Sequence, residues 1–135
     1  MARILVIEDD DQVRAMLKQM LEVAGHEVTE APDGEAAIQL QKQNPANLVI
    51  TDIIMPVKEG LETIMDLRKA FPALKIIAIS GGGQLGPDGY LKSAQILGAD
   101  RIFPKPLEMK TVLDTVQELL KEGESEISET HPTEI

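Results

Sequence analysis

Acidic, hydroxyl and ammonium side chains follow four apolar runs of this chain, at the point where each run ends. They are Glu8 and Asp9 after residues 4–7, Asp52 after residues 48–51, Ser80 after residues 76–79 and Lys105 after residues 102–104. If the runs are neighbouring parallel strands, their carboxyl ends form one functional edge of the sheet, and these side chains meet there. Such a cluster could bind a hard cation and a phosphoryl group.

Carboxylates held together repel each other, by about 4 kcal/mol for two charges ~4 Å apart at an effective dielectric near 20. A raised pKa or a bound cation relieves that repulsion. Oxygen ligands alone suit Mg²⁺, and the chain has no cysteine to favour a softer metal. Asp52 is the predicted nucleophile because it ends a central strand, and its attack on phosphorus gives an aspartyl phosphate. Ser80 and Lys105 could stabilise the charge that develops.

Each of these residues also has a purely structural interpretation. Residues 8–11 can be an acidic start of a helix. Asp52 can be a turn former and Ser80 part of a glycine-rich loop. Their joint occurrence, each at the end of a different strand, favours the chemical interpretation.

Hydrophobic periodicity predicts five strand–helix pairs. The expected strands are residues 4–7, 27–31, 48–51, 75–79 and 101–103. The expected helices are residues 10–24, 33–44, 61–71, 90–97 and 109–120. This alternation, with unbroken apolar strands, predicts an α/β fold: a three-layer, doubly wound parallel sheet covered by helices on both faces.

Composition predicts one domain with an aliphatic core, since hydrophobic residues make up 43% of 135 residues and aromatic residues only 2%. No apolar stretch approaches the ~20 residues of a membrane span, and the first residues lead directly into a strand. We therefore expect a cytoplasmic protein. The net charge of −10 argues against direct binding to nucleic acid.

The charge is concentrated at the end of the chain. Residues 122–135 contain five Glu and no Lys or Arg, and so carry half of the net charge of −10. We expect residues 1–121 to form the folded domain and residues 122–135 to be an acidic, disordered tail.

The motifs closely resemble the receiver domain of two-component response regulators. The matching stretches are residues 4–10, residues 52–56 with Gly60, residues 79–80, residues 98–100 and residues 105–107. The resemblance covers residues 3–121 and implies a flavodoxin-like sheet with strand order 2-1-3-4-5. Since no output domain follows residue 121, a stand-alone receiver is expected, with a receiver cut from a longer protein as the alternative.

The resemblance also implies a role for each site residue. Asp52 is the expected phosphoacceptor, Asp9 a direct Mg²⁺ ligand and Glu8 the holder of a metal-bound water. The backbone carbonyl of Ile54 is expected to be a further ligand. The remaining implied roles are a switch hydroxyl at Ser80, a phosphoryl-pairing lysine at Lys105 and a cis peptide bond before Pro106.

One position departs from the family pattern, and two others, at which receivers differ among themselves, bear on how long the phosphoryl group is kept. The position of the usual aromatic switch residue is Ile102, and Phe103 should face the opposite side of the strand. Signalling could then run through residues 81–89. Ile54 and Gly82 have no side chain that could position an attacking water, so we expect slow loss of the phosphoryl group.

The implied phosphoryl donor is a sensor histidine kinase or a histidine phosphotransfer protein, and the output is a contact with another protein. The chain is expected to assist its own phosphotransfer without being a turnover enzyme. A haloacid-dehalogenase-like phosphatase is the main rival hypothesis, but it requires an acid where Ile54 stands. Two weaker hypotheses are a flavodoxin-like cofactor binder and a docking module that is never phosphorylated.

Overall fold

A computed structural model of the chain describes residues 2–53, 60–80, 95 and 97–130. Within them, five parallel strands form one sheet in the order β2-β1-β3-β4-β5. The strands are β1 (Arg3–Ile7), β2 (Glu27–Ala31), β3 (Leu48–Asp52), β4 (Lys75–Ser80) and β5 (Arg101–Pro104). The predicted strands, their parallel arrangement and the strand order are confirmed.

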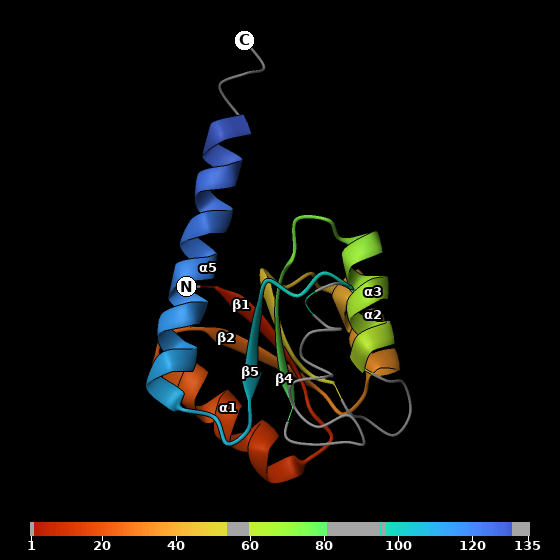
Figure 1. Ribbon diagram of the computed structural model, residues 1–135, viewed down its shortest axis with the longest axis vertical. Coiled ribbons are helices and arrows are strands. Elements are labelled where there is room, and N and C mark those ends of the chain that lie inside the picture. The colour runs from red at the N-terminus through yellow and green to blue at the C-terminus, as the bar shows by residue number, and fades with distance from the viewer. Residues whose placement is uncertain (1, 54–59, 81–94, 96, 131–135) are drawn as a thin grey trace.

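Four helices are labelled along the described chain (Figure 1). They are α1 (Asp11–Val23), α2 (Gly34–Gln43), α3 (Gly60–Ala70) and α5 (Met109–Thr130). Asp10 caps α1 by accepting hydrogen bonds from the backbone of Gln12 and Val13, and Asp33 caps α2 in the same way. The predicted helix over residues 90–97 falls mostly outside the described residues.

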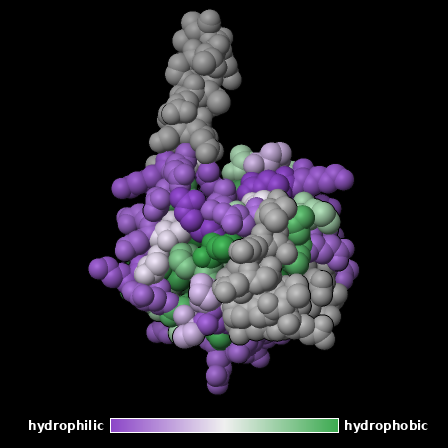
Figure 2. Space-filling view, viewed as in Figure 1, coloured by the Kyte–Doolittle hydropathy of each residue, from purple (hydrophilic) through white to green (hydrophobic). Residues whose placement is uncertain are grey.

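The helices cover both faces of the sheet, and each face has its own apolar cluster. Figure 1 shows α1 and α5 on one side and α2 and α3 on the other. Leu17 and Leu21 of α1 pack with Val116 of α5 against one face, whereas Ile64 and Leu67 of α3 pack against the other. Hydrophilic residues dominate the described part of the face in Figure 2, so the aliphatic side chains are mostly inside.

The length of α5 corrects one expectation from the sequence. The expected disorder from residue 122 is wrong for residues 122–130, because α5 continues to Thr130 and projects beyond the sheet (Figure 1). Val116 and Leu119 anchor the helix in the core, and extending an anchored helix avoids the cost of nucleation. Arg101 of β5 adds ion pairs with Glu118 and Glu122. The domain boundary at residue 121 stays a prediction.

The strand register brings the predicted site residues to one edge. Asp52 pairs with Ile79 across β3 and β4, and Ser80 pairs with Pro104 across β4 and β5. Because every strand runs in the same direction, the residues that follow β1 and β5 emerge beside these two strand ends. The sheet therefore positions side chains that are far apart in sequence.

Candidate phosphoryl-acceptor site

Backbone hydrogen bonds extend the sheet by one residue at both β1 and β5. The Glu8 N–H donates to the Ala31 carbonyl at 3.1 Å, and the Lys105 N–H donates to the Ser80 carbonyl at 3.0 Å. Glu8 and Lys105 are therefore fixed almost as firmly as strand residues. Their side chains therefore start from fixed backbone positions at the edge of the sheet.

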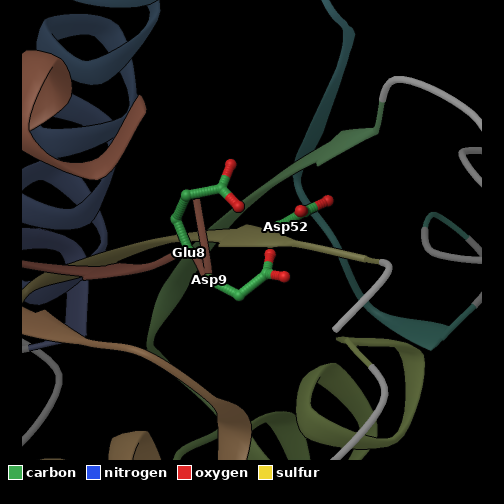
Figure 3. A group of neighbouring side chains, drawn as sticks. All are labelled: Glu8, Asp9 and Asp52. Atoms are coloured by element: carbon green, nitrogen blue, oxygen red, sulfur yellow. The ribbon is translucent and has the colours of Figure 1, made fainter. Parts of the chain in front are cut away.

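Three carboxylates gather at this edge. Figure 3 shows Glu8 and Asp9, which follow β1, beside Asp52 at the end of β3. One carboxylate oxygen from each residue lies within 4.8 Å of the others. Glu8 is 0% exposed and Asp52 is 5% exposed, whereas Asp9 is open to solvent. The predicted cluster is thus formed by the fold, with two buried carboxylates and one exposed.

The Lys105 ammonium lies against the two buried carboxylates. Its Nζ is 2.7 Å from Glu8 Oε1 and 3.3 Å from Asp52 Oδ2. A lysine suits this position because its compact charge can approach two acids at once. The ion pairs leave the exposed Asp9 as the carboxylate that faces solvent.

The crowding of charge shifts the acid–base properties of the cluster. Burial raises the pKa of the Glu8 carboxyl above its usual value and the Asp52 carboxylate adds to the rise, although Lys105 opposes it. Desolvation and the nearby Glu8 raise the pKa of Asp9. Burial alone would lower the pKa of Lys105, but Glu8 and Asp52 outweigh it and hold that pKa above its usual value. The site therefore has more negative charge than Lys105 alone neutralises.

Ser80 brings a hydroxyl to the same edge. The residue is 0% exposed, and among the described residues its Oγ has no hydrogen-bond partner. A buried hydroxyl without a partner costs free energy, and such groups need an explanation, for which a functional role is one candidate. The position of Ser80 beside Asp52 in the sheet is the one that the sequence predicts.

Two predictions at β5 can be compared with the structure directly. The peptide bond between Lys105 and Pro106 is cis, as predicted. Ile102 packs with the apolar cluster beneath α2 and α3, while Phe103 packs with the cluster beneath α1 and α5. The prediction that these two side chains face opposite sides of the sheet is confirmed. Ile54 and Gly82 lie outside the described residues.

The sequence interpretation missed Arg14 of α1. Its guanidinium donates to the Glu8 carbonyl at 2.7 Å and also pairs with Asp11 and Glu30. A basic residue one turn into a helix that starts with several acids could have signalled this contact.

The close approach of Gly60 to the site was also missed, although Gly60 was noted as part of a motif. A Cβ at this position would lie closer than 3.0 Å to the Asp52 carbonyl oxygen and to Ile53 Cα. The Gly60 N–H donates to the Ile53 carbonyl at 2.7 Å. The start of α3 is thus pressed directly against the end of β3, and only a glycine fits without displacement.

The arrangement suits a domain that accepts a phosphoryl group and holds it, since a buried carboxylate at a strand end lies beside acids that can bind a cation and a lysine that can pair with phosphate. Comparison with known families gives the same class. The response regulator receiver domain family matches residues 4–117, and the chain belongs to this family. It is therefore a phosphoacceptor signalling module of two-component systems.

Individual relatives match over nearly the whole described chain. The response regulator receiver protein CpdR of Brucella abortus is 32% identical over 123 residues, which cover 89% of this chain and 98% of that protein. The chemotaxis protein CheY of Halobacterium salinarum is 28% identical over 118 residues, with 87% and 96% covered. The crystal structure of a CheY-like receiver domain protein from Methanospirillum hungatei JF-1 superposes with a TM-score of 0.85 at 31% identity, with 92% and 97% covered.

The chain also resembles part of a much longer protein. The sensor kinase CckA of Brucella abortus is 30% identical over 122 residues, which cover 89% of this chain but only 13% of the kinase. Among the described residues, no helix has the length and apolar character needed to cross a membrane.

Proposed function

We propose that Asp52 is the phosphoacceptor and that a sensor histidine kinase or a histidine phosphotransfer protein is the donor. A carboxylate oxygen of Asp52 forms a bond to phosphorus while the P–N bond of the donor phosphohistidine breaks and the imidazole leaves. The observation that carries the proposal is the convergence of Glu8, Asp9 and Asp52 beside Lys105. Membership of the receiver family supports it.

The donor set fits Mg²⁺. Three carboxylates offer oxygen ligands within 4.8 Å of one another, and the chain has no cysteine thiolate to favour a softer metal. We propose that Asp9 and Asp52 hold the ion directly and that Glu8 holds one of its waters. Bound there, Mg²⁺ supplies positive charge against the phosphoryl oxygens. The proposed fourth contributor, the Ile54 carbonyl, lies outside the described residues.

Lys105 and Ser80 complete the proposal. The Lys105 ammonium, already 3.3 Å from Asp52 Oδ2, pairs with a phosphoryl oxygen once Asp52 is modified. The buried Ser80 hydroxyl then gains the acceptor that the described residues do not give it. Both groups stabilise the phosphorylated state, so the domain stores the phosphoryl group and the signal passes to another protein through a changed surface.

The proposal also covers the setting of the protein. Its partners are the phosphoryl donor and a downstream protein, not nucleic acid, since the net charge of −10 disfavours contact with phosphate backbones. We propose a cytoplasmic location and no turnover of external substrates. Ile54 in place of an acid argues against a phosphatase of the haloacid-dehalogenase type.

The test is phosphorylation by a small donor. Incubation with acetyl phosphate and Mg²⁺ is expected to give a phosphoryl adduct, detected by intact mass, in the wild type but not in Asp52→Ala. Asp66→Ala, which changes an acid on α3 in the same way, is the matched control and is expected to form the adduct. The proposal is wrong if the wild type forms no Mg²⁺-dependent adduct, or if Asp52→Ala forms the same one.

Asp9→Asn tests the electrostatics of the metal site. A carboxyl whose pKa is raised by folding stabilises the fold when protonated, below its unfolded pKa, and loses that contribution as the pH rises through its folded pKa. At pH 7 the ionised Asp9 therefore destabilises the metal-free protein, and the neutral Asn is expected to raise the melting temperature by roughly 2 °C, a small effect because solvent screens this exposed side chain. The gain should vanish at acidic pH.

Thermal melts with and without about 10 mM Mg²⁺, enough to load a weak divalent site, check this prediction. Mg²⁺ should stabilise the wild type more than Asp9→Asn, which has lost a ligand. Asp114→Asn, which makes the same change at an acid of α5 outside the carboxylate cluster, is the control. A lower melting temperature for metal-free Asp9→Asn at pH 7 would contradict the prediction.

A further inference from the structure

Arg14 of α1 forms a hydrogen bond with the backbone of the candidate site, although it is not one of the clustered acids. Its Nη1 donates to the Glu8 carbonyl oxygen at 2.7 Å, and the donor comes from α1. The Glu8 N–H already donates to Ala31 of β2. Both backbone polar groups of Glu8 are therefore hydrogen-bonded, one to a strand and the other to a helix.

Two acids hold Arg14 in this position. Its Nη2 lies 2.5 Å from Asp11 Oδ1, and its Nε lies 3.6 Å from Glu30 Oε1. Glu30 also pairs with Lys18 at 3.6 Å. The Arg14 side chain is only 18% exposed. A planar guanidinium with several donors can join three such partners at once, which a lysine ammonium cannot do with the same geometry.

The Glu8 carbonyl belongs to the peptide group that links Glu8 to Asp9. Because a peptide group is planar, the direction of this carbonyl constrains the backbone on both sides of it. The side chains on its two sides are the buried Glu8 carboxylate and the exposed Asp9 carboxylate of the cation cluster. Holding the carbonyl therefore restricts how both carboxylates can point toward Asp52.

We propose that Arg14 is a positioning residue: by clamping the Glu8–Asp9 peptide, it pre-orients two of the three carboxylates for Mg²⁺. The inference rests on the proposed function of the site. Groups that orient metal ligands typically contribute about 10–100-fold to metal affinity, as their removal shows. We expect Arg14→Met to weaken Mg²⁺ binding by about 10-fold.

The direction of this change separates positioning from simple charge. Arg14 is a cation near a cation site, so removing its charge should by itself strengthen Mg²⁺ binding. A positioning role predicts the opposite, weaker binding. Arg14→Lys keeps the charge and a flexible ammonium but not the planar fork of donors, and should fall between the wild type and Arg14→Met.

Arg101 provides a matched control. It also donates to a backbone carbonyl, that of Asp100, and pairs with two acids, Glu118 and Glu122. It lies at the start of β5, at the opposite end of that strand from the site. Arg101→Met should therefore remove a similar set of contacts without changing Mg²⁺ affinity.

The experiment is calorimetric titration of the metal-free full chain with Mg²⁺ alone, with amide NMR shifts of Asp9 and Asp10 recorded before metal is added. Four results would together support the inference. Arg14→Met binds Mg²⁺ more weakly, and Arg14→Lys partly restores the affinity. The Asp9 and Asp10 amide shifts change in the metal-free variants, and Arg101→Met keeps the wild-type affinity. If Arg14→Met does not fold, Arg14→Lys replaces it. Mg²⁺ binding that is at least threefold weaker in Arg14→Lys, with unchanged Mg²⁺ affinity in Arg101→Lys, would then support the inference.

Two failures can be told apart. If the wild type binds Mg²⁺ and forms the Asp52 adduct, but the folded Arg14 variants bind Mg²⁺ as well as or better than the wild type, the positioning role is overturned alone. If the wild type binds no Mg²⁺ and forms no adduct, the proposed function is overturned, and the role of Arg14 falls with it.

Discussion

Lys105→Met is expected to slow phosphoryl transfer to Asp52 by about 10²-fold or more, the usual loss when one preorganised group that stabilises transition-state charge is removed. The Lys105 Nζ lies 2.7 Å from Glu8 Oε1 and 3.3 Å from Asp52 Oδ2, so it is in place before a phosphoryl group arrives. Methionine keeps similar length and packing but has no charge. The initial rate of adduct formation from acetyl phosphate, followed by intact mass, measures the effect.

The same substitution should destabilise the fold at neutral pH. Removing one partner of a buried ion pair typically costs about 3–5 kcal/mol, because the remaining charge stays buried. Without Lys105, the folded pKa of the buried Glu8 rises further, so stability is retained below the unfolded pKa of the carboxyl and lost as the pH rises. Urea denaturation should therefore show a large deficit at pH 7 that shrinks toward pH 4.

Lys110→Met is the matched control for this prediction, since Lys110 is an exposed lysine in the first turn of α5. It should change neither the transfer rate nor the stability appreciably. A Lys105→Met protein that forms the adduct within twofold of the wild-type rate would contradict the role given to this lysine.

Gly60→Ala should lower the free energy of unfolding by about 1–3 kcal/mol, the range for inserting a methyl group where there is no space. The new Cβ would lie closer than 3.0 Å to the Asp52 carbonyl oxygen, which is backbone and cannot simply rotate away. Among described glycines, positive φ is found at Gly25 and Gly98, so the conformation of Gly60 is not the cause. The end of β3 or the start of α3 must move, and the transfer rate should fall as Asp52 is displaced.

Gly123→Ala is a control for which the expected change in the free energy of unfolding is zero or an increase. Gly123 is also helical, but the nearest atom to its Cβ would be Lys75 Cε at 3.8 Å, an ordinary contact. Alanine favours a helix over glycine by about 1 kcal/mol, so this variant should be neutral or more stable. Urea denaturation of both variants measures the contrast. Equal stability of Gly60→Ala and the wild type would show that the close approach is relieved at no cost.

The sequence was sufficient to predict the strands and the edge of the sheet at which the candidate residues lie, because both depend on simple local patterns. Unbroken apolar runs predict buried parallel strands, and the rule that their carboxyl ends share an edge brings Asp52, Ser80 and Lys105 together. Each of these residues lies at the predicted edge. Alternation along β5 likewise predicted that Ile102 and Phe103 face opposite clusters.

What the sequence did not reveal depends on contacts with backbone atoms. The signal for Arg14 was a basic residue near the acidic start of a helix, and this signal does not show that the guanidinium reaches the Glu8 carbonyl oxygen. The restriction at Gly60 arises from the path of β3 against α3, which residue types do not encode. The acidic composition after residue 121 predicted disorder, but a helix anchored at Val116 and Leu119 continues through it.

The charges at the strand ends also bear on which ions the site can use. Glu8, Asp9 and Asp52 contribute three negative charges when ionised and Lys105 one positive charge, which leaves an excess of two. One divalent cation restores neutrality within a cluster whose ligand atoms lie within 4.8 Å. A monovalent ion would neutralise only half of the excess, and two of them would repel each other at this separation. Charge balance alone thus favours a divalent cation over a monovalent one at this site.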